Sequence, residues 1–256
     1  MGKNNLEYEL DENNYFLPKD YKLFNKEFNH SFDKDKFYNE DKSFWNSERI
    51  RLSGSFQLPI YNYISKKVEK HSTVLDIGCG VATKLMNVIQ KKSSKVFGID
   101  QPSAIDFAKK IHCYENLHSC NFDDPSTWGL EIPSIDLIIC SDVIEHVVYP
   151  DNLLNLIKNF SSDKTKIFIS TPNRDYARGK KNRFSPKKEH IREWNDLEMK
   201  TYLLSRNFEV LKITHHLPYD IRKHGLKASL YDFYNCTFVN KGKFNYNMLL
   251  ECKLKL

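Results

Sequence analysis

A glycine-rich turn after a short apolar run is the segment of this sequence best suited to holding a ligand. The run Val74–Ile77 leads into Gly78 and Gly80, and a helical pattern follows. Glycines let the backbone approach a ligand closely and adopt conformations that a Cβ atom would forbid. Asp76 stands two residues before the first glycine, where its carboxylate would repel a pyrophosphate and attract a cation. The turn therefore predicts a site for a cationic amino-acid group.

Two common nucleotide-binding motifs do not fit this turn. The dinucleotide fingerprint needs a third glycine at position 83, where the chain has Thr83. A P-loop needs Gly-Lys followed by Ser or Thr, which the sequence lacks. The turn is therefore not expected to grip a chain of phosphates.

Polar residues also close the apolar runs that follow. Asp100 ends the run Val96–Asp100, twenty residues after Gly80, where a carboxylate can accept hydrogen bonds from ribose hydroxyls. Asn121 offers a side-chain oxygen for an adenine amine, and Phe122 offers a backbone N–H and an apolar face. Because the carboxyl ends of parallel strands share one edge of a sheet, we expect these residues to line one site.

The segment Cys140–Val147, which reads CSDVIEHV, carries the candidate bases. Asp142, Glu145 and His146 follow an apolar run directly, and His146 is the favoured base because imidazole titrates near working pH. The alternative is that Glu145 and His146 only order the loop.

A basic segment at 174–192 has eight basic residues and two acidic ones. It follows another apolar run, so it should lie on the same edge of the sheet. Arg174 and Arg192 could bind a phosphate or carboxylate of the acceptor, and His190 could reach the substrate. The alternative is a solvated basic loop, with Trp194 in the core and its neighbours bracing it.

The pattern of apolar runs and helical stretches predicts an α/β fold. Strands are expected at 73–77, 95–99, 117–122, 135–140, 166–170, 208–216 and 246–254. Helices are expected at 56–67, 83–91, 104–114, 151–160 and 196–205. Continuous apolar strands alternating with helices indicate a doubly wound, Rossmann-like, mostly parallel seven-stranded sheet, with an antiparallel last strand. Residues 1–54, rich in aromatics, are expected to form a helical flap packed on a domain at 55–256.

Composition limits the class of protein. The 256 residues are 40% hydrophobic, enough for a buried core, and the net charge of +6 is too weak to argue for a stable nucleic-acid complex. The six cysteines form no C-x-x-C pair, so we expect no metal ligands. The first residues lack the apolar core of a signal peptide, and no apolar run approaches the ~20 residues that span a membrane. A cytoplasmic protein is expected, and its oligomeric state stays open.

With LDIGCG, the acid at 100 and SDVIEHV in this order, the chain resembles class I S-adenosylmethionine-dependent methyltransferases over roughly residues 50 to 175. The resemblance implies S-adenosylmethionine as cofactor. Asp76 and the Gly78–Gly80 turn would hold its methionine end, with Gln57 reaching the carboxylate. Asp100 would hold the ribose, and Ser141 would line the sulfonium.

The remaining cofactor contacts implied by the resemblance come from Gln101, next to the ribose-binding acid, and from Asn121 and Phe122 at the adenine. The chain departs from the family pattern in two places. Ala82 stands where many members have another glycine, and Asn121 stands where an acid is commoner.

The same resemblance suggests the acceptor. We expect a small anionic molecule, phosphorylated or nucleotide-activated, since relatives with SDVIEHV and a His-Ile-Arg-Glu-Trp-like segment often act in surface-polysaccharide biosynthesis. One alternative is an RNA or protein methyltransferase, although the chain has no Asn-Pro-Pro-Tyr-like motif. Others are a quinone or lipid methyltransferase, which would want an apolar flap, and a non-catalytic binding module. The methylated atom, O, N or C, is left open.

A first prediction follows from the strand-end acid. Replacing Asp100 by alanine should weaken the binding of S-adenosylmethionine by about tenfold to more than a hundredfold, because hydrogen bonds to a charged acceptor contribute roughly 1.5–3 kcal/mol. Titration calorimetry measures this, and circular dichroism checks that the variant is folded. An unchanged dissociation constant would show that Asp100 does not hold the ribose.

Overall fold

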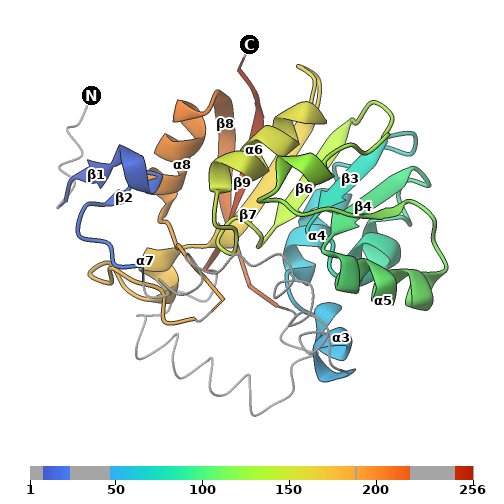
Figure 1. Ribbon diagram of the computed structural model, residues 1–256, viewed down its shortest axis with the longest axis horizontal. Coiled ribbons are helices and arrows are strands. Elements are labelled where there is room, and N and C mark those ends of the chain that lie inside the picture. The colour runs from blue at the N-terminus through green and yellow to red at the C-terminus, as the bar shows by residue number, and fades with distance from the viewer. Residues whose placement is uncertain (1–7, 24–46, 188, 220–245, 256) are drawn as a thin grey trace.

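A computed structural model describes residues 8–23, 47–187, 189–219 and 246–255. In these parts of the chain, one sheet has the strand order β5-β4-β3-β6-β7-β9-β8 (Figure 1). Its strands are β3 Val74–Ile77, β4 Val96–Asp100, β5 Leu117–Ser119, β6 Leu137–Ser141, β7 Lys166–Pro172, β8 Phe208–His216 and β9 Asn247–Leu254. The first five pair in parallel, and β9 runs antiparallel to both β7 and β8. The mostly parallel seven-stranded sheet with an antiparallel last strand is thus confirmed.

Helices connect these strands and cover both faces of the sheet. They are α3 Ser47–Ser53, α4 Leu58–Ser65, the π-helix η2 Leu85–Ile89, α5 Pro102–His112, α6 Pro150–Asn159, α7 Arg174–Ala177 and α8 Asp196–Ser205. A short hairpin of β1 Leu10–Asp11 and β2 Leu17–Pro18, joined by the 3₁₀ turn η1 Glu12–Asn14, precedes them. Another 3₁₀ turn, η3 Pro125–Thr127, follows β5.

Side-chain alternation along β3 separates two apolar cores. Leu75 and Ile77 belong to the core under α6 and α8, whereas Val74 belongs to the core under α4, η2 and α5. Successive side chains of a strand point to opposite faces, so each central strand contributes to both layers. Helices on both sides of a buried parallel sheet explain why its strands are continuous apolar runs.

Several predicted boundaries hold, and two differ for physical reasons. α8 begins with a complete capping box, in which Asn195 and Glu198 each accept the other's backbone N–H. Within the range 83–91, where an α-helix was expected, Leu85–Ile89 form a π-helix. Its Gln90 N–H donates to the Leu85 carbonyl at 2.8 Å. The strand expected at 117–122 ends at Ser119, and the backbone of Asn121 is bound by side chains of the following turn.

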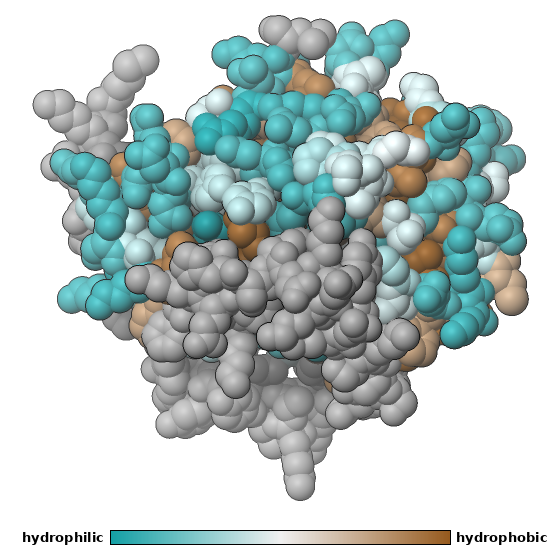
Figure 2. Space-filling model, in the orientation of Figure 1, coloured by the Kyte–Doolittle hydropathy of each residue, from teal (hydrophilic) through white to brown (hydrophobic). Residues whose placement is uncertain are grey.

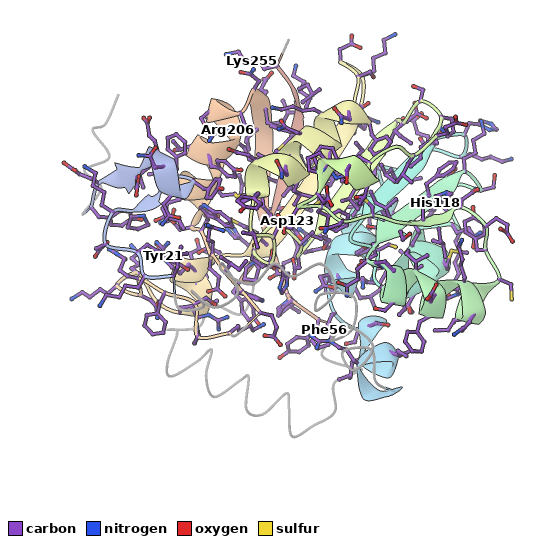
Figure 3. All side chains as sticks on the ribbon, viewed as in Figure 1. Tyr21, Phe56, His118, Asp123, Arg206 and Lys255 are labelled. Carbon is purple, nitrogen blue, oxygen red and sulfur yellow. The ribbon has the colours of Figure 1, made fainter. Side chains whose placement is uncertain are left out.

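The first described residues pack beside α8, at the left of Figure 1. The Trp194 Nε1–H donates to the carbonyl of Tyr15 at 2.8 Å, and the Glu193 N–H donates to the hydroxyl of Tyr21 at 3.0 Å. Tyr21 is labelled in Figure 3. This part of the predicted flap is a β hairpin rather than a helix. Most of the aromatics that suggested the flap lie at 24–45, outside the described residues, so the division at 54/55 stays a prediction.

The face turned toward the viewer in Figure 2 is mainly hydrophilic wherever coloured residues form it, with apolar side chains scattered between them. Among the described residues, no helix is both long enough and apolar enough to pass through a bilayer.

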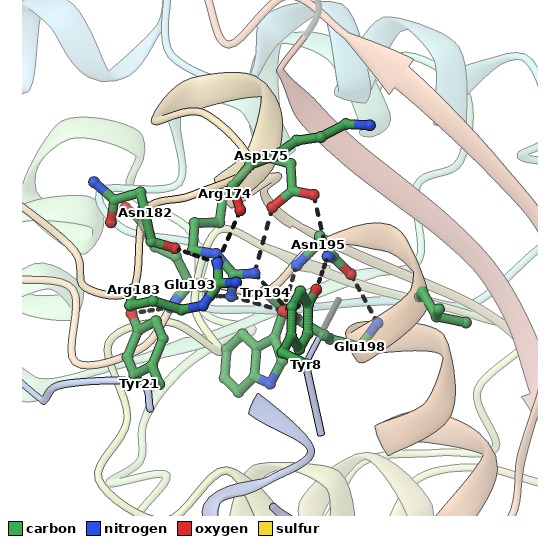
Figure 4. A network of polar contacts seen from close by, with 12 residues as sticks. Tyr8, Tyr21, Arg174, Asp175, Asn182, Arg183, Glu193, Trp194, Asn195 and Glu198 are labelled. Carbon is green, nitrogen blue, oxygen red and sulfur yellow. Dashed lines mark hydrogen bonds and ion pairs between the residues drawn. The ribbon is translucent and has the colours of Figure 1, made fainter. Parts of the chain in front are cut away.

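An ion-pair network joins α7 to α8 beneath the hairpin (Figure 4). The guanidinium of Arg174 is completely buried and donates to both carboxylate oxygens of Glu198, at 2.7 and 2.6 Å. It also donates to the Glu193 carbonyl at 3.1 Å and to Asp175 at 3.3 Å, and the hydroxyl of Tyr8 donates to Glu198 at 2.6 Å. Two-pronged pairing of this kind compensates a guanidinium for its lost hydration.

A second prediction follows from this burial. Arg174→Met should lower the free energy of unfolding by about 3–5 kcal/mol, because the carboxylate of Glu198 would stay buried without its cation. Urea unfolding measures the loss. Arg206→Met is the matched control: its pair with Asp151 is partly exposed, at 30% and 40%, and should contribute about 0–1 kcal/mol. Equal losses in the two variants would contradict the role given to the network.

Candidate active site at the carboxyl edge of the sheet

The turn after β3 adopts left-handed backbone conformations. Gly78 has φ of 79° and Gly80 has φ of 57°. A Cβ at Gly78 would lie 2.1 Å from the Cγ2 of Val143, so the turn and the loop after β6 meet where no side chain fits. Ala82, at the position where many family members have glycine, also has a positive φ, 55°. The turn keeps the shape of a glycine-rich turn despite this substitution.

Asp76 lies fully buried at the base of the turn. The hydroxyl of Tyr61 donates to both of its carboxylate oxygens, at 2.9 Å each. Burial raises the pKa of Asp76 to about 7, although the hydrogen bond from Tyr61 and the charge of Lys84 oppose the shift. A bound cation would favour the ionised form of this carboxyl group.

Asp100, at the end of β4, faces the same turn. Its carboxylate accepts the N–H of Gly80 at 2.6 Å and the N–H of Gln101 at 2.7 Å. These two backbone bonds fix the carboxylate in place beside the turn. Gln101 thus contributes its backbone to orienting the acid.

Asn121 and Phe122 lie in the loop after β5. The side-chain oxygen of Asn121 accepts the Asp123 N–H at 3.0 Å, and Phe122 packs partly buried against the core. Asp123, which is labelled in Figure 3, in turn accepts the N–H groups of Val148 and Tyr149, at 3.0 and 2.7 Å. These bonds tie the loop to the start of α6. The oxygen proposed for the adenine amine therefore already orders its own loop.

Asp142, a predicted base, is held by several donors. Its carboxylate accepts the amide of Gln57 at 3.0 Å, the hydroxyl of Ser170 at 2.8 Å and the amide of Asn247 at 3.1 and 2.8 Å. The hydroxyls of Ser141 and Ser170 lie 2.8 Å apart. These contacts stabilise the anion and make Asp142 an anchor for three segments. Gln57, expected at the methionine carboxylate, uses its amide for this anchor.

Glu145, His146 and His190 form a cluster just beyond the end of β6. The N–H of Ile191 donates to the carbonyl of Glu145 at 2.8 Å, which brings the 189–192 loop against the loop after β6. The two imidazole rings meet edge to face with centroids 4.7 Å apart. The structure thus brings together three of the predicted catalytic residues.

The protonation states in this cluster follow from its surroundings. Burial raises the pKa of Glu145 well above its usual range, and the nearby charge of Asp142 raises it further. Loss of hydration lowers the pKa of His146, and repulsion from His190 adds to the shift. The His146 side chain keeps 39% of its area exposed, so a solute can reach it. A neutral imidazole beside a carboxyl group can accept a proton or bind a cation.

Glu193 holds His190, one member of the cluster, in place. One of its oxygens is 2.7 Å from Nδ1 of His190, and the guanidinium of Arg178 donates to both oxygens at 3.1 and 3.0 Å. Burial alone would raise the pKa of Glu193, but the bonds from His190 and Arg178 outweigh it and hold the pKa at about 2. Glu193 is therefore an anion that orients His190.

The two arginines expected to bind the acceptor point elsewhere. Arg174 is fully buried in the network with Glu198 (Figure 4). Arg192 is also buried: it donates to the Val148 carbonyl at 3.1 Å and lies over the ring of Tyr15, 4.6 Å from its centroid. Both guanidinium groups hold the protein together, which corrects the expectation that they face a substrate.

Several residues of the site belong to no recognisable sequence motif. Tyr61 and Lys84 surround Asp76, Ser170 and Asn247 hold Asp142, and Glu193 orients His190. Tyr61 lies on the helix before the first strand, and Asn247 is 105 residues from its partner. Only the fold brings such residues together.

These features fit S-adenosylmethionine. A left-handed glycine turn, a buried acid with a raised pKa and a strand-end acid suit its methionine end and its ribose. When bound, the cofactor supplies an electrophilic methyl group on a sulfonium. Asp76, the Gly78–Gly80 turn and Asp100 would hold it at this edge.

Comparison with known proteins agrees with the fold. Residues 48–213 match the family described as Methyltransferase domain. The fold is similar to a chain of the complex between the Haloferax volcanii Trm112 methyltransferase activator and a methyltransferase, with TM-score 0.63 and 14% identity over 86% of this chain and 98% of that one. It is also similar to a S-adenosylmethionine-dependent methyltransferase from Clostridium acetobutylicum, with TM-score 0.55 and 14% identity over 86% and 100%.

Among curated proteins, the chain is similar to the ubiquinone biosynthesis O-methyltransferase of Coxiella burnetii. The two are 26% identical over 117 residues, which are 44% of this chain and 50% of the relative. The chain thus spans about half the length of the curated relatives it matches. With most of the sheet inside the matched residues, the chain belongs to the methyltransferase-domain family and has the fold of these methyltransferases.

Proposed function

We propose that the protein transfers the methyl group of S-adenosylmethionine to a hydroxyl oxygen of a small molecule. The observation that carries this proposal is the cluster of Glu145, His146 and His190 at the end of β6. It lies on the sheet edge that presents the cofactor turn, and Val143 of the same loop packs against Gly78. A hydroxyl must lose its proton as its oxygen attacks the methyl group, and this cluster can take up that proton or stabilise the oxyanion.

The remaining requirement for catalysis is to position the acceptor oxygen. The sulfonium is already an activated leaving group, so the oxygen must be held in line with the methyl, and such placement can supply about 7–11 kcal/mol of the barrier. The cluster is fixed from three sides, by Glu193, by Thr171 and by the loop contact of Ile191. A rigid cluster beside the cofactor turn suits this task.

A phenolic hydroxyl is the acceptor class that we favour. The relatives above are named as O-methyltransferases of ubiquinone biosynthesis. An anionic acceptor was expected to bind Arg174 and Arg192, but both arginines contact groups of the protein itself. The exposed cations of the basic segment include Lys180, Lys181 and Lys187. A phosphorylated acceptor bound by these lysines is the second candidate. Nothing in the relatives points to surface polysaccharides, and a cytoplasmic location stays a prediction.

A third prediction tests the acceptor class. Incubated with labelled cofactor, the protein should methylate an oxygen of catechol and leave a sugar phosphate unmodified, as product mass will show. Changing Lys180, Lys181 and Lys187 together to glutamine should leave the methylation of catechol unaltered. Methylation of the sugar phosphate alone, lost in the triple variant, would replace the phenol by an anionic acceptor.

A fourth prediction tests the cluster. His146→Gln should lower kcat with the accepted substrate by at least about a hundredfold, the lower end of what positioned proton transfer contributes. Affinity for the cofactor should not change, because His146 lies in the loop after β6 and not in the glycine turn after β3. His71→Gln, an exposed histidine in the loop before β3, is the control and should keep full activity. A normal kcat for His146→Gln would remove the cluster from the reaction.

A fifth prediction concerns pH. Asp76, with its pKa raised to about 7, is protonated below that pH in the free protein, and the cofactor's ammonium group should favour its carboxylate. Binding then releases a proton, so affinity should rise with pH up to about 7, by at most about tenfold per pH unit. It should fall again above about pH 8, where an α-amino group loses its charge.

Calorimetry with S-adenosylhomocysteine in buffers of different ionisation enthalpy measures both the affinity and the released proton. In Asp76→Asn the affinity should be lower and its rise toward pH 7 should disappear. Affinity that does not change across the acid range in the unaltered protein would contradict a titrating Asp76.

A further inference from the structure

We propose that Glu145, His146 and His190 form a binding site for a divalent cation of the zinc class. Cysteine spacing gave no reason to expect a metal, but the described residues place one carboxylate and two imidazoles around a common point. One ligand atom from each lies within 4.8 Å of the others. A tetrahedral ion with bonds of about 2.1 Å would hold them about 3.4 Å apart, so the rings need to move inward by roughly 1 Å.

The hydrogen bonds of both rings orient them for this role. Nδ1 of His146 is 2.7 Å from the carbonyl oxygen of Glu189, which can only accept, so this nitrogen carries the proton. Nδ1 of His190 is 2.7 Å from the Glu193 carboxylate and donates to it in the same way. Each ring then has its lone pair on Nε2. Pairing of the far nitrogen with a carbonyl or carboxylate is the usual outer support of a metal-bound histidine.

Glu145 supplies an independent observation. Its Oε2 accepts the hydroxyl of Thr171 at 2.9 Å, but Oε1 is buried with no hydrogen-bond partner among the described residues. The Nε2 atom of the neutral His146 ring lies 3.9 Å from this oxygen. A buried carboxylate oxygen without a donor is costly. A cation between Oε1 and the two Nε2 atoms would satisfy it.

The ligand set selects the type of ion. Two imidazole nitrogens and one carboxylate oxygen suit Zn²⁺ and its first-row neighbours, whereas Mg²⁺ and Ca²⁺ prefer oxygen ligands. Three protein ligands leave at least one position open, as in catalytic rather than structural zinc sites. If the proposed function holds, that position would bind the acceptor hydroxyl and lower its pKa, so that its proton passes to solvent water and the cation stabilises the oxyanion that attacks the methyl group.

The test measures metal binding without any acceptor, so its outcome is separate from that of the proposed function. Full-length protein freed of metal with a chelator is titrated with Co²⁺, whose visible absorption reports nitrogen and oxygen ligands, and then with Zn²⁺ in competition. We expect one ion per chain and displacement by Zn²⁺. His146→Gln and Glu145→Gln should each weaken binding by at least about a hundredfold, and His71→Gln should bind like the unaltered protein.

Two results would overturn the site: no saturable spectral change, or equal affinity in the unaltered protein and both variants. A thiolate-to-cobalt charge-transfer band would place the ion on a cysteine and would overturn it as well. His146 is partly exposed, and glutamine preserves the contact of residue 145 with Thr171, so both variants should fold; circular dichroism verifies this. Full methyltransferase activity of the metal-free protein would remove the cation from acceptor binding and leave the proposed function in place.

Discussion

The site depends on the close approach of two loops, the turn after β3 and the loop after β6. Gly78 and Val143 meet so closely that a single Cβ would lie 2.1 Å from a methyl group. Because β3 and β6 are hydrogen-bonded neighbours in the centre of the sheet, the turn after β3 and the segment that carries Asp142, Glu145 and His146 pack together as one unit. Close packing of this kind leaves little room for either loop to move without displacing the other.

Glu193 joins this unit to the C-terminal half of the chain. It binds His190 and Arg178 through its side chain and Tyr21 through its backbone N–H, so it links the 189–192 loop, the basic segment and the N-terminal hairpin. A buried anion with donors on every side costs little, whereas the same anion without them would be strongly destabilising. The arginines Arg174, Arg178 and Arg192 of the basic segment therefore bind groups of the protein itself, whereas Lys180, Lys181 and Lys187 are exposed to solvent.

The separation along the chain between interacting residues explains how much of the fold and the site could be predicted from the sequence. The glycine turn, the strand-end acid and the capping box of α8 were predictable because each depends on residues close together in the chain. Arg174 and Arg192 were wrongly expected to bind a substrate, because charge counts do not show partners such as Glu198 or Val148, 24 and 44 residues away. The ring contact between His146 and His190 was equally hidden, since it needs two loops to meet.

Asp142 and Glu145 lie three residues apart on one loop, and their different surroundings give them different roles. Asp142 receives hydrogen bonds from Gln57, Ser170 and Asn247, which occupy both of its carboxylate oxygens and hold the side chain in place. Glu145 receives one bond on one oxygen, and its other oxygen faces His146. The nearby charge of Asp142 makes ionisation of Glu145 harder, and a positive charge at the cluster would reverse that effect. A metal ion bound at the cluster would therefore be stabilised by both carboxylates, at the place where the acceptor oxygen is expected to react.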